Sequence, residues 1–139
     1  MTETRQTVYV VEDDEAVRDS LELLLKSDGK AVRTYENANV FLKDYSDDMA
    51  GCIVLDIRMP GMDGMELQKK LNEKHSLLPI IFVTGHGDVP MAVDAMKEGA
   101  VDFIQKPYRE EALLEKIESA LEKDLEQRKT LGEKQEIVR

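Results

Sequence analysis

Five short apolar runs, each followed by polar residues, alternate along the chain with segments of helical periodicity. The runs are rich in β-branched residues, as is typical of buried strands. Because a helical segment follows each run, we predict an α/β fold, a doubly wound parallel sheet of five strands covered on both faces by five helices. The predicted strands are Thr7–Val11, Ala31–Tyr35, Cys52–Leu55 running into Asp56, Ile80–Val83 ending at Thr84, and Val101–Gln105.

Capping and helix-ending residues mark the helices between these strands. Gly29 ends the first helix, Asn37 caps the second, and the third begins near Gly64. Pro90 in the first turn and Gly99 after the last turn bracket the fourth helix.

The last helix begins near Arg109 and has a regular apolar face. Its inward residues are predicted to be Leu113, Leu114, Ile117, Ala120 and Leu121. Beyond about Lys123 the apolar spacing decays. We therefore predict one domain over residues 4–121 and, over residues 122–139, a helical extension that begins a linker.

Composition narrows the function classes. The chain has 139 residues, 42% of them hydrophobic, and a formal net charge of −10, which argues against direct binding to DNA or to anionic membranes. No signal peptide and no apolar stretch of membrane-spanning length is present, so we expect a cytoplasmic protein. The single cysteine, Cys52, lies in an apolar strand and is interpreted as a small buried hydrophobe.

Candidate chemistry gathers at the carboxyl ends of the predicted strands. Glu12 and Asp13 follow the first strand, Asp56 ends the third, Thr84 the fourth and Lys106 the fifth. In open parallel sheets ligands bind at this edge. We therefore expect these side chains to converge.

Crowded carboxylates raise one another's pKa unless a cation neutralises them. Oxygen ligands favour a hard ion, so Glu12, Asp13 and Asp56 indicate Mg²⁺. The alternative, a solvated acidic loop at the start of a helix, explains Asp14 and Glu15 but not the arrival of Asp56 at the same edge.

Beside Mg²⁺, a carboxylate can attack a phosphoryl group to form an aspartyl phosphate. Lys106 can then pair with phosphate oxygens, and the Thr84 hydroxyl can donate to another.

Four motifs together resemble the receiver domain of bacterial two-component response regulators, over roughly residues 7–121. They are Val10–Asp14, Leu55–Gly64, Thr84 and Lys106–Pro107. The resemblance implies the flavodoxin-like receiver fold and a phosphoryl group transferred from a sensor histidine kinase to Asp56. Such a domain is a regulatory switch rather than an enzyme, since it catalyses only its own phosphorylation and dephosphorylation.

The resemblance also implies the roles of the other site residues. Asp13 is a direct Mg²⁺ ligand, Glu12 ligates directly or through water, and the backbone carbonyl of Arg58 completes the protein ligands. Lys106 is the phosphate-binding lysine. Thr84 is the switch hydroxyl, Phe103 takes the switch-aromatic position, and the Lys106–Pro107 bond is expected to be cis.

Two registrations of the acidic pair are open, because three acids run in sequence. The pair is either Glu12–Asp13 or Asp13–Asp14. Arg18 and the pattern of the first helix favour Glu12–Asp13, since Asp14 is then the first residue toward that helix.

The segments 84–90 and 99–104 resemble the FixJ subgroup. Its members usually join such a receiver to a LuxR-type DNA-binding domain, whereas some similar receivers precede an ATPase that activates sigma-54 polymerase. Neither output lies in these residues, so DNA is expected as a partner only through an absent output domain. The resemblance also implies a homodimer on phosphorylation, across the face of the fourth helix and fifth strand, about residues 89–105.

Other functions fit the sequence less well. An aspartate-nucleophile phosphatase of the haloacid-dehalogenase type needs an aspartate at the position of Arg58. A flavodoxin-like FMN binder needs a Ser/Thr/Gly phosphate loop after a strand, and a phosphate-independent interaction domain has no need of the Asp56, Thr84 and Lys106 set. His75 and His86 have no spacing that suits a zinc site, and His86 is interpreted as a mobile surface residue.

Overall fold

The computed structural model of this protein describes the backbone of residues 5–85 and 87–138, and the side chains of these residues up to Thr130. Its strands pair in parallel in the order β2-β1-β3-β4-β5, which confirms the predicted sheet. The order changes direction between β1 and β3, and such a point is where open α/β sheets bind ligands. The strands are β1 (Thr7–Val11), β2 (Ala31–Tyr35), β3 (Gly51–Asp56), β4 (Ile80–Thr84) and β5 (Asp102–Gln105).

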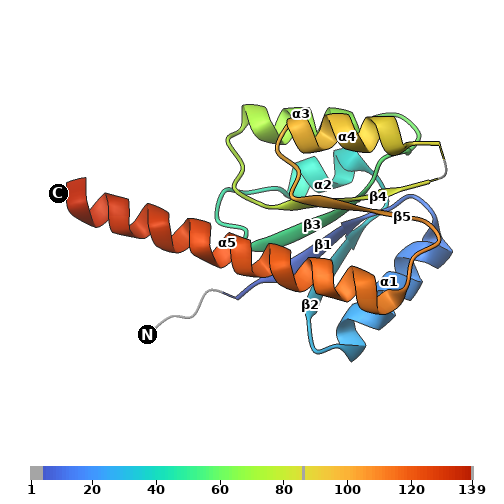
Figure 1. Ribbon diagram of the computed structural model, residues 1–139, viewed down its shortest axis with the longest axis horizontal. Helices are drawn as coiled ribbons and strands as arrows, with labels where there is room; N and C mark the ends of the chain where they lie inside the picture. The colour runs from blue at the N-terminus through green and yellow to red at the C-terminus, as the bar shows by residue number, and fades with distance from the viewer. Residues whose placement is uncertain (1–4, 86, 139) are drawn as a thin grey trace.

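Helices cover both faces of the sheet. α1 and α5 lie on one face, and α2, α3 and α4 lie on the other (Figure 1). The predicted cap is confirmed, because Asn37 Oδ1 accepts from the Val40 N–H at 2.8 Å. The helices are α1 (Glu15–Ser27), α2 (Ala38–Asp44), α3 (Gly64–Glu73), α4 (Val89–Lys97) and α5 (Glu110–Val138).

The core consists of two aliphatic layers, one on each face of the sheet. Alternation along the strands builds both layers, since Tyr9 packs with α2, α3 and α4 while Val8 and Val10 pack with α1 and α5. Cys52 is fully buried, as predicted, and burial raises the pKa of its thiol to about 12. It is therefore a packing residue and not a reactive thiol.

α5 continues past the sheet as one unbroken helix (Figure 1). Asp124, which the sequence placed in a polar extension, is fully buried. Its carboxylate accepts hydrogen bonds from the Gly51 N–H at 2.9 Å, from Gln6 Nε2 at 3.0 Å and from Arg128 Nε at 2.9 Å. The structure thus ties the start of the extension to the sheet.

Gly51 is required at the point where Asp124 meets the sheet. Its φ of +136° is unfavourable for other residues, and a Cβ there would stand 1.8 Å from the Thr7 carbonyl oxygen.

Residues 4 and 139, the outer limits of the two predicted segments, lie outside the described residues, and the boundary at 121 stays a prediction.

Three smaller expectations concern single residues. The Lys106–Pro107 peptide bond is cis, as predicted. His75 is exposed at the end of α3, and His86 lies outside the described residues. Among the residues that are described, no helix is both long enough and apolar enough to span a membrane.

Candidate functional site

Three carboxylates meet at the carboxyl edge of the sheet. β1 delivers Glu12 and Asp13, and neighbouring β3 delivers Asp56. One oxygen from each side chain lies within 4.8 Å of the others. Glu12 is buried, Asp56 is half-buried and Asp13 is exposed. The predicted convergence of the three acids is therefore present, with one open side toward solvent.

Glu12 is the most firmly held of these acids. Its Oε2 accepts from the Asp14 N–H at 3.1 Å, and its Oε1 lies 3.5 Å from Lys106 Nζ. The Arg18 guanidinium donates to the Glu12 backbone carbonyl at 2.9 Å. These contacts hold the loop after β1 against the end of β5.

Burial, with a smaller contribution from the Asp56 charge, raises the pKa of Glu12 to about 7, while the hydrogen bond from the Asp14 N–H and the Lys106 charge oppose the shift. Burial also raises the pKa of Asp56, and Lys106 again lowers it. Both carboxyl groups therefore hold a proton more readily than they would in water. A cation placed between them would replace that proton.

The donor set suits Mg²⁺, the ion that the sequence predicts. Glu12, Asp13 and Asp56 offer only oxygen atoms, and Mg²⁺ prefers oxygen ligands with several retained waters. The exposed position of Asp13 leaves room for such waters. The Arg58 backbone carbonyl, the fourth predicted ligand, lies two residues after Asp56.

Asp13 and Asp14 differ in what their side chains do. Asp14 is the N-cap of α1, and its Oδ1 accepts from the Val17 N–H at 3.2 Å. Asp13 lies instead with the acidic cluster. A capping carboxylate turned toward its helix is a poorer candidate for the metal, so the geometry favours the Glu12–Asp13 registration.

Thr84 and Lys106 close the other side of the site. Thr84 is fully buried, and its hydroxyl lies 3.5 Å from the Ile104 carbonyl, longer than an ordinary O–H···O hydrogen bond. The Lys106 N–H donates to the Thr84 carbonyl at 2.8 Å. Phe103 is half-buried and packs against the core under α2, α3 and α4.

The turn after Asp56 depends on Gly64. The Gly64 N–H donates to the Ile57 carbonyl at 2.8 Å, and a Cβ on Gly64 would stand 2.5 Å from the Asp56 carbonyl oxygen. Asp63 and Glu66 form a capping box that starts α3 at this point. The glycine therefore lets the turn close tightly behind β3.

One contact at the site was missed from the sequence. Arg58 Nε donates to Asp88 Oδ1 at 2.6 Å, and Asp88 is only 4% exposed. From the sequence, Arg58 was expected to act through its backbone carbonyl, and Asp88 was only one residue of the segment 84–90 that resembles the FixJ subgroup. The opposite charges were visible, but only the fold brings residues 30 apart into contact.

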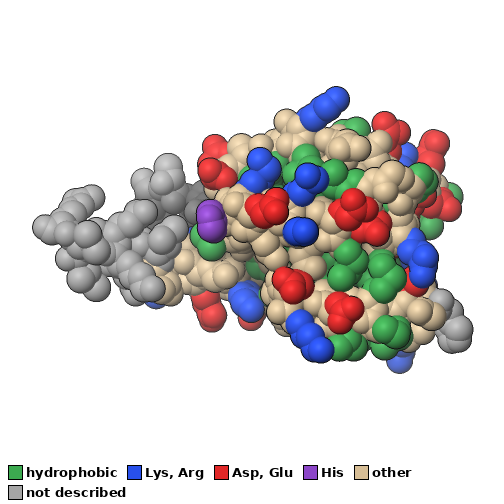
Figure 2. All heavy atoms as spheres, turned by 90° about the horizontal axis from the view of Figure 1, so that it is seen from above, with side chains coloured by type: hydrophobic (Ala, Val, Ile, Leu, Met, Phe, Trp, Pro, Cys, Tyr) green, Lys and Arg blue, Asp and Glu red, His purple; other side chains and the backbone are tan. Residues whose placement is uncertain are grey.

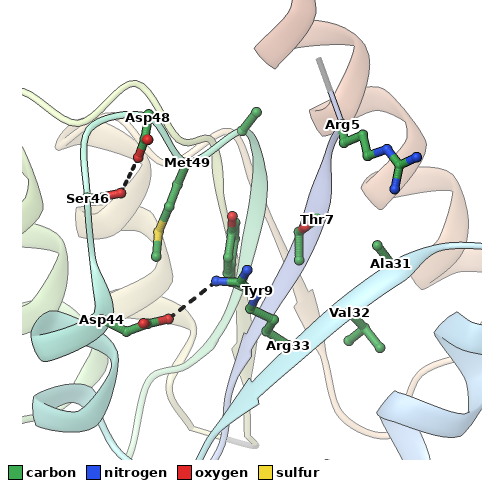
Figure 3. A pocket seen from close by; sticks show the side chains of 11 residues that line it. Arg5, Thr7, Tyr9, Ala31, Val32, Arg33, Asp44, Ser46, Asp48 and Met49 are labelled. Atoms are coloured by element: carbon green, nitrogen blue, oxygen red, sulfur yellow. Dashed lines mark hydrogen bonds and ion pairs between the residues drawn. The ribbon is translucent and has the colours of Figure 1, made fainter. Parts of the chain in front are cut away.

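A cavity of about 620 Å³ lies near the opposite end of the sheet (Figure 3). Thr7 and Ala31, the first residues of β1 and β2, line it together with Arg33 and Asp44. The two charged side chains form an ion pair at 3.6 Å across it. None of the predicted site residues lines this cavity.

Comparison with known proteins identifies the family. Residues 8–118 match the family described as response regulator receiver domain. The chain therefore belongs to this family, and the domain is a regulatory module rather than an enzyme that turns over substrates.

Two curated relatives show where in the family the chain falls. It is 46% identical over 128 residues to the response regulator protein TodT of Pseudomonas putida, covering 92% of this chain and 56% of that protein. It is 49% identical over 118 residues to the transcriptional regulatory protein FixJ of Bradyrhizobium diazoefficiens, covering 85% of this chain and 58% of that protein. The chain thus spans a little over half the length of these relatives.

Solved structures agree with both sequence comparisons. The response regulator StyR superposes with a TM-score of 0.90 at 45% identity, over 95% of this chain and 67% of that one. Full-length FixJ from B. japonicum superposes with a TM-score of 0.80 at 47% identity, over 88% of this chain and 60% of that one. The likeness to the FixJ subgroup inferred from the sequence is confirmed.

Proposed function

We propose that Asp56 accepts a phosphoryl group from a cognate histidine kinase and that the phosphoryl group switches the domain between two states. The observation that carries the proposal is the placement of Asp56 beside the acids Glu12 and Asp13 and within reach of the charge of Lys106. This arrangement supplies a nucleophile, an oxygen-rich metal site and a positive charge for the transferred group.

The transfer needs little chemistry from the protein beyond positioning. A carboxylate oxygen of Asp56 attacks phosphorus, and the phosphorus–nitrogen bond to the donor histidine breaks. Lys106 offsets the negative charge of the new phosphoryl oxygens as a point charge. Mg²⁺, held by Glu12, Asp13, Asp56 and the Arg58 carbonyl, would neutralise charge on the transferring oxygens.

Thr84 and Phe103 are proposed to transmit the phosphorylation state. The long contact of the Thr84 hydroxyl leaves it able to donate to a phosphoryl oxygen, which would draw the loop after β4 toward Asp56. That movement makes room for the half-buried Phe103 to turn inward. Moving a switch from about 1:99 to 99:1 requires roughly 5.5 kcal/mol of differential stabilisation, which several charge-assisted contacts can supply.

We propose that the active state is a homodimer across α4 and β5. Figure 2 looks onto the face covered by α3 and α4, where apolar side chains are exposed among charged ones. Val89, Val93 and Met96 are 37%, 45% and 38% exposed and follow helical spacing along α4. A second copy would bury this stripe, whereas the net charge of −10 keeps unphosphorylated domains apart.

The kinase is proposed to dock beside Lys106. A groove of about 580 Å³ between α1 and the segment after β5 is lined by Val17, Leu21, Lys106, Pro107 and Tyr108. Its mainly apolar wall suits a helix that carries the donor histidine. Lys106 belongs both to this groove and to the acceptor site, so a donor bound there faces Asp56.

The output is proposed to be transcription. The relatives that cover the chain include a transcriptional regulatory protein, FixJ, and they are nearly twice the aligned length. DNA would be bound by a further domain, as the acidic receiver itself is unsuited to it. An aspartate-dependent phosphatase is less well supported, because position 58 holds an arginine paired with Asp88. A receiver that controls a sigma-54-dependent ATPase is also less well supported, because the likeness to FixJ is strong.

Phosphorylation is tested by intact mass after incubation with acetyl phosphate or phosphoramidate and Mg²⁺. We expect one added phosphate, absent in Asp56→Asn and lost on chelation. Lys106→Ala, which leaves the acceptor in place, should be phosphorylated more slowly. Equal labelling of the Asp56→Asn protein would refute the assignment.

A further inference from the structure

α4 starts differently from the three helices before it. The N-cap side chains Asp14, Asn37 and Asp63 each accept an N–H of the helix that they precede. Asp88 is the N-cap of α4, yet within the described residues its side chain accepts no N–H of α4. An aspartate in this position normally stabilises a helix by about 1 kcal/mol, so its carboxylate is used elsewhere.

That carboxylate faces the loop between β3 and α3, which follows Asp56. Asp88 Oδ1 accepts from Arg58 Nε at 2.6 Å, and Oδ2 lies 3.4 Å from where a Cβ on Gly85 would stand. The Asp88 side chain is 6% exposed and that of Arg58 is 71% exposed. Among the described residues Arg58 is the ion-pair partner of Asp88, and a buried charge depends strongly on such a partner. The exposed arginine, in contrast, can turn to another anion.

The pair joins two loops that both begin at the site. Arg58 is two residues after Asp56, and Asp88 is four residues after Thr84 and directly before α4. We propose that Arg58 and Asp88 form a latch that holds the loop between β4 and α4 in its unphosphorylated position. The latch is a connection from the acceptor to α4 that does not pass through Thr84 and Phe103.

The proposal rests on the proposed function, since a phosphoryl group on Asp56 is what would weaken the latch. Such a group brings additional negative charge beside the loop that carries Arg58 and competes with Asp88 for the guanidinium. Asp88 is then released to cap α4, where the N–H of Met91 is the third in the helix. The same charge that marks the active state would therefore free the loop between β4 and α4 from Arg58 and let Asp88 stabilise the start of α4.

The surroundings leave space for this exchange. A cavity of about 300 Å³ lies beside the pair and is lined by Arg58, Met59, Pro60, Asp63 and Met91. Met91 comes from the first turn of α4, so the cavity separates that turn from the loop between β3 and α3. The cavity gives the first turn of α4 space in which to move.

Amide hydrogen exchange in the absence of any phosphoryl donor tests the latch by itself. Arg58→Gln and Asp88→Asn should each speed exchange in the loop between Thr84 and Val89 by about fivefold or more. Lys26→Gln, which breaks the 3.0 Å surface pair with Glu22 on α1, is the matched control and should change nothing there. Unchanged exchange in both latch variants overturns the proposal, whether or not the protein accepts phosphate.

Beryllofluoride titration monitored by sedimentation tests the coupling. Each latch variant should dimerise at about a fivefold lower beryllofluoride concentration than the wild type. The double variant should match the single variants, since both remove one contact. Arg58→Lys, which keeps the charge, should shift the midpoint less than Arg58→Gln. If the shifts of the two single variants add up in the double variant, the latch proposal is overturned. It is also overturned if both single variants dimerise at the beryllofluoride concentration of the wild type.

The two tests also separate the latch from the proposed function. A wild-type chain that gains no phosphate and never dimerises refutes the function, while the exchange experiment still decides the latch. A chain that is phosphorylated and dimerises normally, with latch variants indistinguishable from wild type in exchange, refutes the latch alone.

Discussion

The buried carboxylate of Asp124 accepts a 2.9 Å hydrogen bond from the Gly51 N–H, which links the α5 extension to the first residue of β3. Arg128 pairs with the same carboxylate and also donates to the Met49 carbonyl. The bond lies at the end of the sheet opposite the acidic cluster. The extension therefore leaves the receiver in a direction that the sheet fixes.

This relationship predicts the effect of removing Asp124. Asp124→Ala should lower the free energy of unfolding by about 2–4 kcal/mol, because the buried Gly51 N–H loses its acceptor and Arg128 loses its ion pair. Glu126→Ala, at an exposed position two residues further along α5, should change it by less than about 0.5 kcal/mol. Urea unfolding gives both values, and equal stabilities would show that the bond is not needed.

A truncation after Leu121 tests the predicted domain boundary. If residues 122–139 were only a linker, the shortened chain would unfold at the same urea concentration as the full chain. We expect it instead to match Asp124→Ala or to be less stable, since it also loses the hydrogen bond from Gln127 to the Leu77 carbonyl.

Mg²⁺ binding should depend on Asp13 and not on Asp14. Asp13→Ala removes an acid from the cluster and should weaken binding at least tenfold in titration calorimetry. Asp14→Ala should bind normally but lose about 1 kcal/mol of stability, because Asp14 caps α1. The reverse result would place the metal pair at Asp13–Asp14.

The raised pKa of Glu12 predicts how metal-free stability changes with pH. Between its ordinary pKa near 4.5 and about 7, the folded state binds more protons than the unfolded state. Stability should therefore fall as pH rises through this range, by an amount on the order of 1–3 kcal/mol. Glu12→Gln should lack this part of the dependence. Unfolding curves in a chelator from pH 5 to 8 provide the measurement.

Thr84→Ala should separate phosphorylation from switching. The hydroxyl makes only a long contact to the Ile104 carbonyl, so its loss should cost less than about 1 kcal/mol of stability. The variant should accept phosphate at a rate close to wild type but fail to dimerise, while Thr84→Ser dimerises. Intact mass measures phosphorylation and sedimentation measures dimerisation on the same samples. A Thr84→Ala protein that dimerises normally would exclude Thr84 as the switch hydroxyl.

Local signals in the sequence determined most of the fold. Five β-branched runs, the cap at Asn37 and the proline in the first turn of α4, Pro90, were enough to predict the strands, the helices and the parallel arrangement of the strands. Because parallel strands end at one edge, the positions of Glu12, Asp56 and Lys106 also predicted which chemistry would meet there. These features depend on neighbours within a few residues, where backbone preference and burial act directly.

The tertiary structure alone decided the contacts between charged residues that are distant in sequence. Nothing in the sequence near Arg58 or Asp88 indicates that they pair across 30 residues. Asp124 was interpreted as one more acid of a polar helix, although it follows Ile117 and Ala120 on the inward face of that helix. A charged side chain is compatible with solvent, a metal or a buried partner. Which of these environments it occupies depends on the loops and strand ends that the completed sheet brings beside it. It also depends on the free-energy cost of burying a charge without a partner.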